Sequence, residues 1–139
     1  MSTEFHQNQT DSEKIFSKNH TDLKSYLNAV GDWIEKETLR HIPEGDPKEY
    51  LYDLMRDYPQ RGGKRFRPAL VLLSCELFGG DPHDAMISAI AFELFHNFAL
   101  IHDDIEDESL LRRGELTLHR KYGTALAINS GDALHCLLH

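Results

Sequence analysis

The sequence predicts an all-α fold of about five to six helices, and three observations support this prediction. Apolar residues recur at spacings of three and four along most of the chain, which is typical of helices with one buried face. No segment sustains the alternation of apolar and polar residues that a half-buried strand requires. Proline and glycine interrupt the apolar periodicity where helices commonly begin and end.

The N-terminal part is predicted to contain a tail followed by a helix. Residues 1–11 are polar and lack periodicity, so we expect a disordered tail there. A helix is predicted from about Ser12, and residues 12–139 are assigned to one partial domain. An apolar stripe from Leu23 to Ile34 would form the buried face of this helix.

A second helix is predicted after Asp46, which would cap it, and Pro47, which would occupy its first position. Pro59 is expected to end this helix, because proline cannot donate a backbone hydrogen bond. Residues 60–67 form a loop rich in glycine and positive charge. Pro68 then opens a third, strongly apolar helix.

The third helix is predicted over residues 69–78 and ends at the glycine pair 79–80. Asp81 and Pro82 repeat the cap-and-proline signal that starts the second helix. The fourth helix is expected to run from there to about Asp107. It is apolar nearly all round, so we expect it to lie buried at the centre of the fold.

The C-terminal part is predicted to contain a loop and one interrupted helix. Residues 108–117 form the loop, and a helical pattern begins at about Leu118 and is broken near Gly123 before it resumes. The chain stops inside this pattern with no capping residue. We therefore expect it to be truncated at the C-terminal end of a larger helical domain.

Composition and charge narrow the class of protein. Of the 139 residues, 40% are hydrophobic, and the formal net charge of −8 argues against a general nucleic-acid binder. Cys75 and Cys136 lie in apolar helical patterns, which favours core positions in a reducing compartment. No run of about eighteen apolar residues predicts a membrane span, and no signal peptide is recognised, so we expect a cytoplasmic protein.

A dense acidic cluster ends the fourth predicted helix. Asp103 and Asp107 are four residues apart and share one helical face. Asp104 flanks this pair, and His96 lies two turns earlier on the same stripe. Like charges at this spacing destabilise a helix, so a cation such as Mg²⁺, which combines one or two carboxylates with substrate phosphates, would compensate them. The alternative is an ordinary solvated helix end.

Two basic segments are suited to phosphate groups. The first, residues 61–68, combines two glycines with several cations just before a predicted helix start, where an anion is favoured. It lacks the glycine spacing of a Walker loop, and the alternative is a solvated basic turn. The second is the pair Arg112 and Arg113, whose guanidinium groups suit phosphate oxygens.

Four segments match a known family in their order and spacing. They read GGKRFRP, ELFHNFALIHDDIED, LRRGELTLH and AINSGDAL, and together they resemble motifs of the trans-type polyprenyl diphosphate synthases. The resemblance spans about Gly62 to Leu134 and implies the N-terminal half of the isoprenoid synthase helical bundle, including its first aspartate-rich motif. It also implies a prenyltransferase that condenses an allylic diphosphate with isopentenyl diphosphate and uses Mg²⁺.

The resemblance implies roles for individual residues. Four are assigned to catalysis: Asp103, Asp104, Asp107 and Arg112. The three aspartates among them would hold Mg²⁺. Six are assigned to substrate binding: Gly63, Lys64, Arg67, His96, Arg112 and Arg113. Arg112 would hold the allylic diphosphate and the others isopentenyl diphosphate. Asp132, in the last motif, is expected to support helix packing or a neighbouring ligand residue.

In this family, the reaction leaves an allylic cation and a diphosphate, and apolar walls keep water away from the cation. Residues about one turn before the first aspartate face the growing tail, and here these are Phe98 and Ala99, with Phe95 one turn further from Asp103. Ala99 leaves space, whereas Phe98 would partly block it. This resembles synthases of medium-chain products such as geranylgeranyl or farnesyl diphosphate. The alternative is that the aromatic residues simply belong to the core.

The chain departs from the family pattern in two respects. Glu115 and Leu116 stand where the family usually has a basic or variable residue followed by proline, which would loosen the loop after Arg113. The second aspartate-rich motif, which binds further Mg²⁺, is absent, so we expect the chain alone to be inactive or nearly so. Family members are usually homodimers, and we expect a homodimer here.

Three other functions compete with this interpretation. A class I terpene cyclase shares an aspartate-rich helix but needs no second cationic cluster. A non-catalytic subunit of a heteromeric prenyl synthase tends to lose the aspartates that are intact here. A di-metal helical bundle needs two Glu-x-x-His pairs, and only Glu93 and His96 form one.

Overall fold

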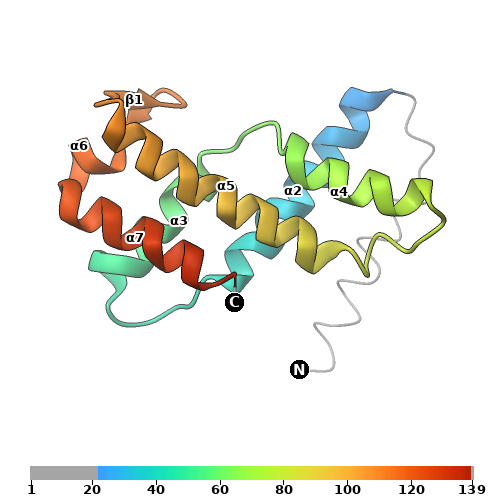
Figure 1. Cartoon of the computed structure of the whole chain (residues 1–139), viewed down its shortest axis with the longest axis horizontal. Helices are drawn as coiled ribbons and strands as arrows, with labels where there is room; N and C mark the ends of the chain where they lie inside the picture. Colours follow the sequence, from blue (N-terminus) through green and yellow to red (C-terminus); the bar gives the residue numbers. More distant parts are fainter. Residues whose placement is uncertain (1–21, 139) are drawn as a thin grey trace.

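A computed structural model describes residues 22–138 and contains six α-helices within them (Figure 1). The elements are α2 (Leu23–His41), the π-helical turn η1 (Lys48–Tyr52), α3 (Asp53–Gln60), α4 (Phe66–Leu77), α5 (Met86–Glu106), β1 (Leu111–Arg112), β2 (Glu115–Leu116), α6 (Leu118–Tyr122) and α7 (Thr124–Cys136). The predicted helical fold is confirmed. The predicted tail and the helix start near Ser12 lie outside the described residues.

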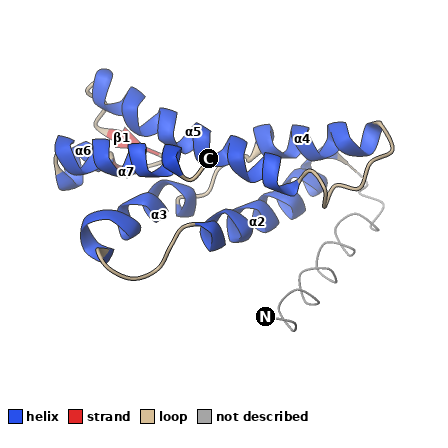
Figure 2. Ribbon diagram, turned by 60° about the horizontal axis from the view of Figure 1, so that its bottom comes forward, coloured by secondary structure: helices blue, strands red, loops and turns tan. Residues whose placement is uncertain are grey.

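The long helix α5 is the central element of the fold. Figure 1 shows α7 alongside one half of α5 and α4 alongside the other half. Helix α2 packs against α4 and α5, while α3 packs against α7 on the same side of the molecule (Figure 2). The core between these helices contains fully buried apolar side chains: Val30, Ile34, Leu72, Ala89 and Leu134.

The prediction that the central helix is buried all round is wrong. Ile87, Phe92 and Phe95 of α5 expose 65%, 54% and 49% of their surface. Leu77 and Phe78, at the end of α4, are exposed as well. The described elements cover α5 on only part of its circumference, so an apolar face of α4 and α5 is open.

Two helix starts differ from the prediction. Pro47, and not Asp46, immediately precedes η1, and no side chain caps this turn. Asp81 accepts a hydrogen bond from the backbone N–H of His83 at 2.9 Å, and the chain turns once more before α5 begins at Met86. In the second case the aspartate stabilises a local turn in place of a helix cap, because its side chain reaches the backbone two residues ahead.

Other boundaries confirm the prediction. Gly79 follows the end of α4 with φ +78°, the left-handed conformation that terminates many helices. Gly123, with φ +90°, separates α6 from α7. Pro59 lies in the last turn of α3, one residue before its end.

Within the described part of the chain, no helix combines the length and the apolar character needed to cross a membrane.

The segment predicted as a loop over residues 108–117 contains a small β-hairpin. Its two strands pair antiparallel, with Leu111 opposite Leu116. Arg113 and Gly114 form the turn and both have positive φ, 56° and 83°. Such a turn matches the twist of the two strands and explains why glycine stands at its second position. The hairpin places the arginine pair beside the end of α5.

Candidate functional site

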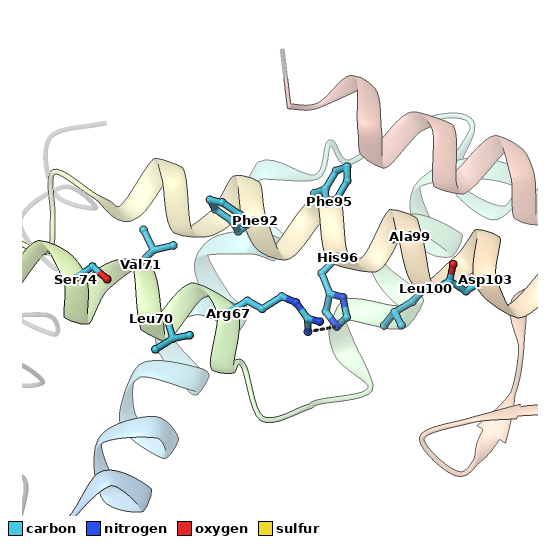
Figure 3. A pocket seen from close by; sticks show the side chains of 10 residues that line it. All are labelled: Arg67, Leu70, Val71, Ser74, Phe92, Phe95, His96, Ala99, Leu100 and Asp103. Carbon is cyan, nitrogen blue, oxygen red and sulfur yellow. Dashed lines mark hydrogen bonds between the residues drawn. The ribbon is translucent and has the colours of Figure 1, made fainter.

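A largely apolar groove of about 660 Å³ lies between α4 and α5. Ten residues line it: Arg67, Leu70, Val71, Ser74, Phe92, Phe95, His96, Ala99, Leu100 and Asp103 (Figure 3). Asp103 lies at one end, and the side chains of Arg67 and His96 meet near the middle (Figure 3). One groove therefore connects a carboxylate, a cation and an apolar wall.

A second pocket of about 210 Å³ adjoins the groove and shares Arg67 and His96 with it. We call it the basic pocket, and it is lined by Lys64, Arg65, Phe66, Arg67, Glu93, His96 and Arg113. It brings together four predicted substrate-binding residues from the loop before α4, from the first turn of α4, from α5 and from the hairpin. Cations gathered around so small a volume suit an anion with several oxygens.

His96 lies where the groove and the basic pocket meet. Nη1 of Arg67 lies 3.4 Å from Nε2 of His96. Burial lowers the pKa of His96 from its ordinary value, and the neighbouring Arg67 lowers this pKa further. The ring is therefore neutral near pH 7, and we assign its proton to Nδ1 so that Nε2 accepts from Arg67. An anion in the pocket would favour the protonated ring.

Arg61 ties the loop before α4 to the hairpin. Its Nη1 donates to the backbone carbonyl of Arg112 at 3.1 Å, and its Nη2 donates to that of Leu116 at 2.8 Å. Nε of Arg61 contacts the Asp57 carboxylate at 2.5 Å. The Arg61 side chain is only 3% exposed, so it serves to connect two chain segments and is not available to a ligand.

Arg113 makes the return connection from the hairpin to the same loop. It donates to the backbone carbonyl of Tyr58 at 3.0 Å and also to that of Gly62. Burial lowers the pKa of the Arg113 guanidinium from its ordinary value, although it stays protonated at neutral pH. A Cβ atom at Gly63 would lie 3.0 Å from Nη2 of Arg113. Glycine at position 63 therefore leaves room for Arg113 to reach the pocket.

Asp104 faces away from the groove and holds Arg112. Its side chain is fully buried, and both of its oxygens accept from Nε of Arg112 at 3.1 Å. Nη2 of Arg112 donates to Oδ1 at 2.5 Å, and the Tyr58 hydroxyl donates to Oδ2 at 2.5 Å. The hydrogen bond to Asp104 raises the pKa of Arg112. Burial raises the pKa of Tyr58, and its own hydrogen bond to Asp104 raises this pKa further.

The three predicted metal ligands therefore do not all face the same side of α5. Asp103 and Asp107 are exposed near the end of α5, whereas the oxygens of Asp104 are already bonded to other side chains. Within residues 22–138, no three His, Cys, Asp or Glu side chains form a metal-binding group. Two exposed carboxylates one turn apart fit Mg²⁺ if substrate phosphates complete its coordination. Asp104 does not fit as a ligand in this arrangement.

The predicted chain-length residues also occupy different places. Phe95 and Ala99 line the groove, but Phe98 does not. The Phe98 ring packs between the rings of His102 and His135 at tilted angles, with centroid distances of 4.7 and 4.9 Å. The structure does not support a direct contact between Phe98 and a substrate tail in this groove.

The last predicted motif lies at the contact between α5 and α7. His102 bonds through Nδ1 to the Phe98 carbonyl within its own helix, and its Nε2 lies 3.3 Å from Oδ1 of Asp132. A Cβ atom at Gly131 would approach the His102 ring to 2.5 Å. Gly131 therefore permits close packing of α7 against α5.

Sequence reasoning missed three residues that organise the site: Tyr58, Arg61 and Glu93. The sequence pattern around Tyr58 predicts only an apolar helical face, and Arg61 resembles the other cations of its loop. Glu93 carried a usable signal, because a carboxylate within an apolar helix must be paired when it is buried. Its partner, Arg65, comes from a distant segment that periodicity cannot identify.

Known proteins resemble this chain over most of its length. The geranylgeranyl pyrophosphate synthase of Geoglobus acetivorans is 43% identical over 113 residues, which cover 81% of this chain and 34% of the relative. The geranylgeranyl diphosphate synthase of Cyanophora paradoxa is 44% identical over 114 residues, which cover 81% and 38%. The chain therefore spans about a third of the length of these curated relatives.

Solved structures show the same similarity. The crystal structure of geranylgeranyl pyrophosphate synthetase from Pyrococcus horikoshii has 41% sequence identity and a TM-score of 0.77, and the match covers 91% of this chain and 36% of that one. The model of the polyprenyl synthetase family matches residues 48–139, which include the groove, the basic pocket and the hairpin. The chain belongs to the polyprenyl synthetase family.

Proposed function

We propose that this chain is part of a chain-elongating prenyltransferase that condenses an allylic diphosphate with isopentenyl diphosphate. One observation carries the proposal: the groove joins the basic pocket to Asp103 along an apolar wall. Such a site accommodates two anionic head groups and their hydrocarbon chains. The names of the relatives, which are geranylgeranyl diphosphate synthases, support the same reaction class.

The basic pocket would bind the diphosphate of isopentenyl diphosphate. Lys64, Arg67 and Arg113 supply fixed positive charge, and His96 supplies a ring that an anion would protonate. Gly63 leaves room for Arg113 beside this group. The apolar part of the substrate would then point along the groove toward Ala99 and Asp103.

The allylic diphosphate would lie near Asp103 and Asp107, with Arg112 beside it in the orientation that Asp104 imposes. When Mg²⁺ is bound by the two exposed carboxylates, it would supply Lewis-acid stabilisation of the departing diphosphate. Loss of diphosphate leaves an allylic cation, which the double bond of isopentenyl diphosphate attacks before a proton is released. Groove walls such as Leu70 and Leu100 would exclude the water that quenches this cation.

Product length and completeness belong to the same proposal. Ala99 leaves space below Asp103, and Phe95 follows one turn deeper in the groove, which favours a medium-chain product such as geranylgeranyl or farnesyl diphosphate. The chain covers 34% of its Geoglobus relative, so we propose that residues beyond it complete the site and that it is inactive alone. We also propose that the protein forms a homodimer and lies in the cytoplasm.

Isothermal titration of the chain with isopentenyl diphosphate, without divalent metal, tests the basic pocket. Binding is expected, and Arg67→Ala should weaken it by about tenfold, because one charge-assisted contact is lost. Lys24→Ala, which removes an exposed cation from α2, should leave binding unchanged. Equal effects of the two substitutions would contradict the proposal.

Turnover is then measured with isopentenyl diphosphate, farnesyl diphosphate and Mg²⁺, for this chain and for a longer chain that includes the remaining part of the fold. We expect product only from the longer chain. Release of diphosphate in the absence of isopentenyl diphosphate would instead support a terpene cyclase. Absence of turnover in both would support a non-catalytic subunit.

A further inference from the structure

Glu93 is the one carboxylate among the residues that line the basic pocket. Its side chain is 2% exposed and forms an ion pair with Arg65, which is buried to the same extent. Asn97 donates from Nδ2 to Oε1 of Glu93 at 2.9 Å. A buried ion pair needs such additional hydrogen bonds, because desolvation of both charges opposes it.

Arg65 connects the basic loop to three other parts of the molecule. Besides its contact with Glu93 on α5, it donates to Glu35 on α2 at 3.1 Å and to the carbonyl of Pro59 at the end of α3. Its backbone has φ +44°, a left-handed conformation that is unfavourable for a residue with a Cβ atom. The buried ion pair therefore stabilises a conformation that the loop would not adopt by itself.

This conformation separates the cations of the loop into two groups. Arg65 is buried, whereas Lys64, one residue before it, and Arg67, two residues after it, are exposed and line the pocket. If Arg65 lost Glu93, it would keep only its contacts with Glu35 and the Pro59 carbonyl, and the backbone around Arg65 would be held less firmly. The orientation of Lys64 and Arg67 then depends on Arg65, whose side chain bonds to Glu93, Glu35 and Pro59 and to neither of these two cations.

We propose that Glu93 is a positioning residue of the basic pocket, which holds Arg65 and thereby fixes the loop so that Lys64 and Arg67 face a bound diphosphate. The identity of the ligand rests on the proposed function, but the positioning role does not. Glu93 thus acts on ligand affinity through the backbone of the loop and not through its own charge.

Glu93→Gln distinguishes position from charge, because the two effects have opposite signs. Loss of a negative charge beside an anion site would by itself tighten anion binding. We expect weaker binding of inorganic diphosphate instead, by about tenfold, as for other supporting residues of a binding site. Isothermal titration of the 139-residue chain without divalent metal measures this change.

Glu35→Gln is the matched control. It removes one negative charge from the same arginine, but the Glu35 side chain is 34% exposed and lies outside the basic pocket. The Glu35 end of this pair is partly open to solvent, so it should contribute less than the fully buried pair with Glu93, and the affinity for inorganic diphosphate should stay within about twofold. Tighter or unchanged binding by Glu93→Gln would overturn the inference.

Amide hydrogen exchange tests the positioning role without any ligand. Glu93→Gln should accelerate exchange at residues 62–67 by about tenfold and leave α7 unchanged, which a general loss of stability would not do. Unchanged exchange in the loop would overturn the inference.

If wild type does not bind inorganic diphosphate, the proposed function fails, while this exchange result still decides the role of Glu93. If Glu93→Gln does not fold, Glu93→Asp, which keeps the charge but shortens its reach, should show the same losses, and wild-type behaviour would overturn the inference.

Discussion

Helix α5 carries two pairs of carboxylates that differ in their surroundings. Asp103 and Asp107 are exposed at the end of the helix, and Asp103 lines the groove. Glu93 and Asp104 are buried, and each contacts an arginine from one of the two basic segments. Asp104 lies eleven positions after Glu93, which is close to three helical turns. Both side chains therefore point to the same side of α5.

The difference teaches that neighbouring residues of one motif serve opposite purposes. Asp103 and Asp104 are adjacent, but a rotation of about 100° between them directs one toward the groove and the other toward Arg112 and Tyr58. Carboxylates on the groove side are free for a ligand. Those on the buried side hold the arginines that frame the ligand site.

The largest expected effect comes from Asp104→Asn. The substitution removes the buried negative charge and replaces one of the two acceptor oxygens with an NH2 group, which cannot accept from Arg112 or Tyr58, so it should lower the free energy of unfolding by about 3 kcal/mol. Urea denaturation measures this loss. Asp107→Asn is the matched control, since the exposed carboxylate should change the free energy of unfolding by less than about 0.5 kcal/mol. Similar values for the two variants would break the comparison.

Tyr58→Phe tests the same buried side with a smaller change. The variant keeps the aromatic ring but removes the hydroxyl that donates to Asp104 at 2.5 Å. Loss of a hydrogen bond to a buried charge should lower the free energy of unfolding by about 2 kcal/mol. Tyr52→Phe, at a partly buried position of η1 that packs against the core, provides the control in the same denaturation measurement. A loss no larger than that of Tyr52→Phe would show that Arg112 alone satisfies Asp104.

The sequence predicts the exposed side of this site better than the buried side. Apolar periodicity located α5, and the spacing of Asp103 and Asp107 placed them on one face. The family motifs brought Lys64, Arg67, His96 and Arg113 together, and the structure places all four around the basic pocket. These features depend on local spacing or on ordered motifs.

The buried side depends on pairs that are distant in sequence. Tyr58 and Asp104 are 46 residues apart, and Arg65 and Glu93 are 28 residues apart. Local periodicity carries no information about which cation meets which carboxylate, so the contacts of Asp104 with Arg112 and Tyr58 are not predictable from it. The open face of α5 was missed for a related reason, because helix periodicity does not show how many neighbours cover a helix.

Asp103→Asn should separate ligand binding from stability. Because Asp103 is exposed, the free energy of unfolding should change by less than about 0.5 kcal/mol. The increase in affinity for inorganic diphosphate that Mg²⁺ produces in wild type should fall by about tenfold, because one oxygen ligand is lost. Titration with and without Mg²⁺ measures the increase. An unchanged increase would show that the exposed carboxylates do not hold the metal.

The smallest expected effect concerns the pH dependence that His96 contributes. Burial, followed by the positive charge of Arg67, lowers the pKa of His96 below its ordinary value of 6.5. Between the two values, the unfolded chain binds more protons than the folded chain, so the free energy of unfolding falls as the pH drops through this range. Between pH 7.5 and pH 5.5, His96→Gln should therefore lose less free energy of unfolding than wild type does, while the other histidines stay in place.

A titration of the His96 ring by NMR should show its pKa rising when inorganic diphosphate binds, since an anion favours the protonated ring. A ring pKa above 6.5 in the free chain would mean that Glu93, and not the surrounding arginines, dominates the charge at the basic pocket.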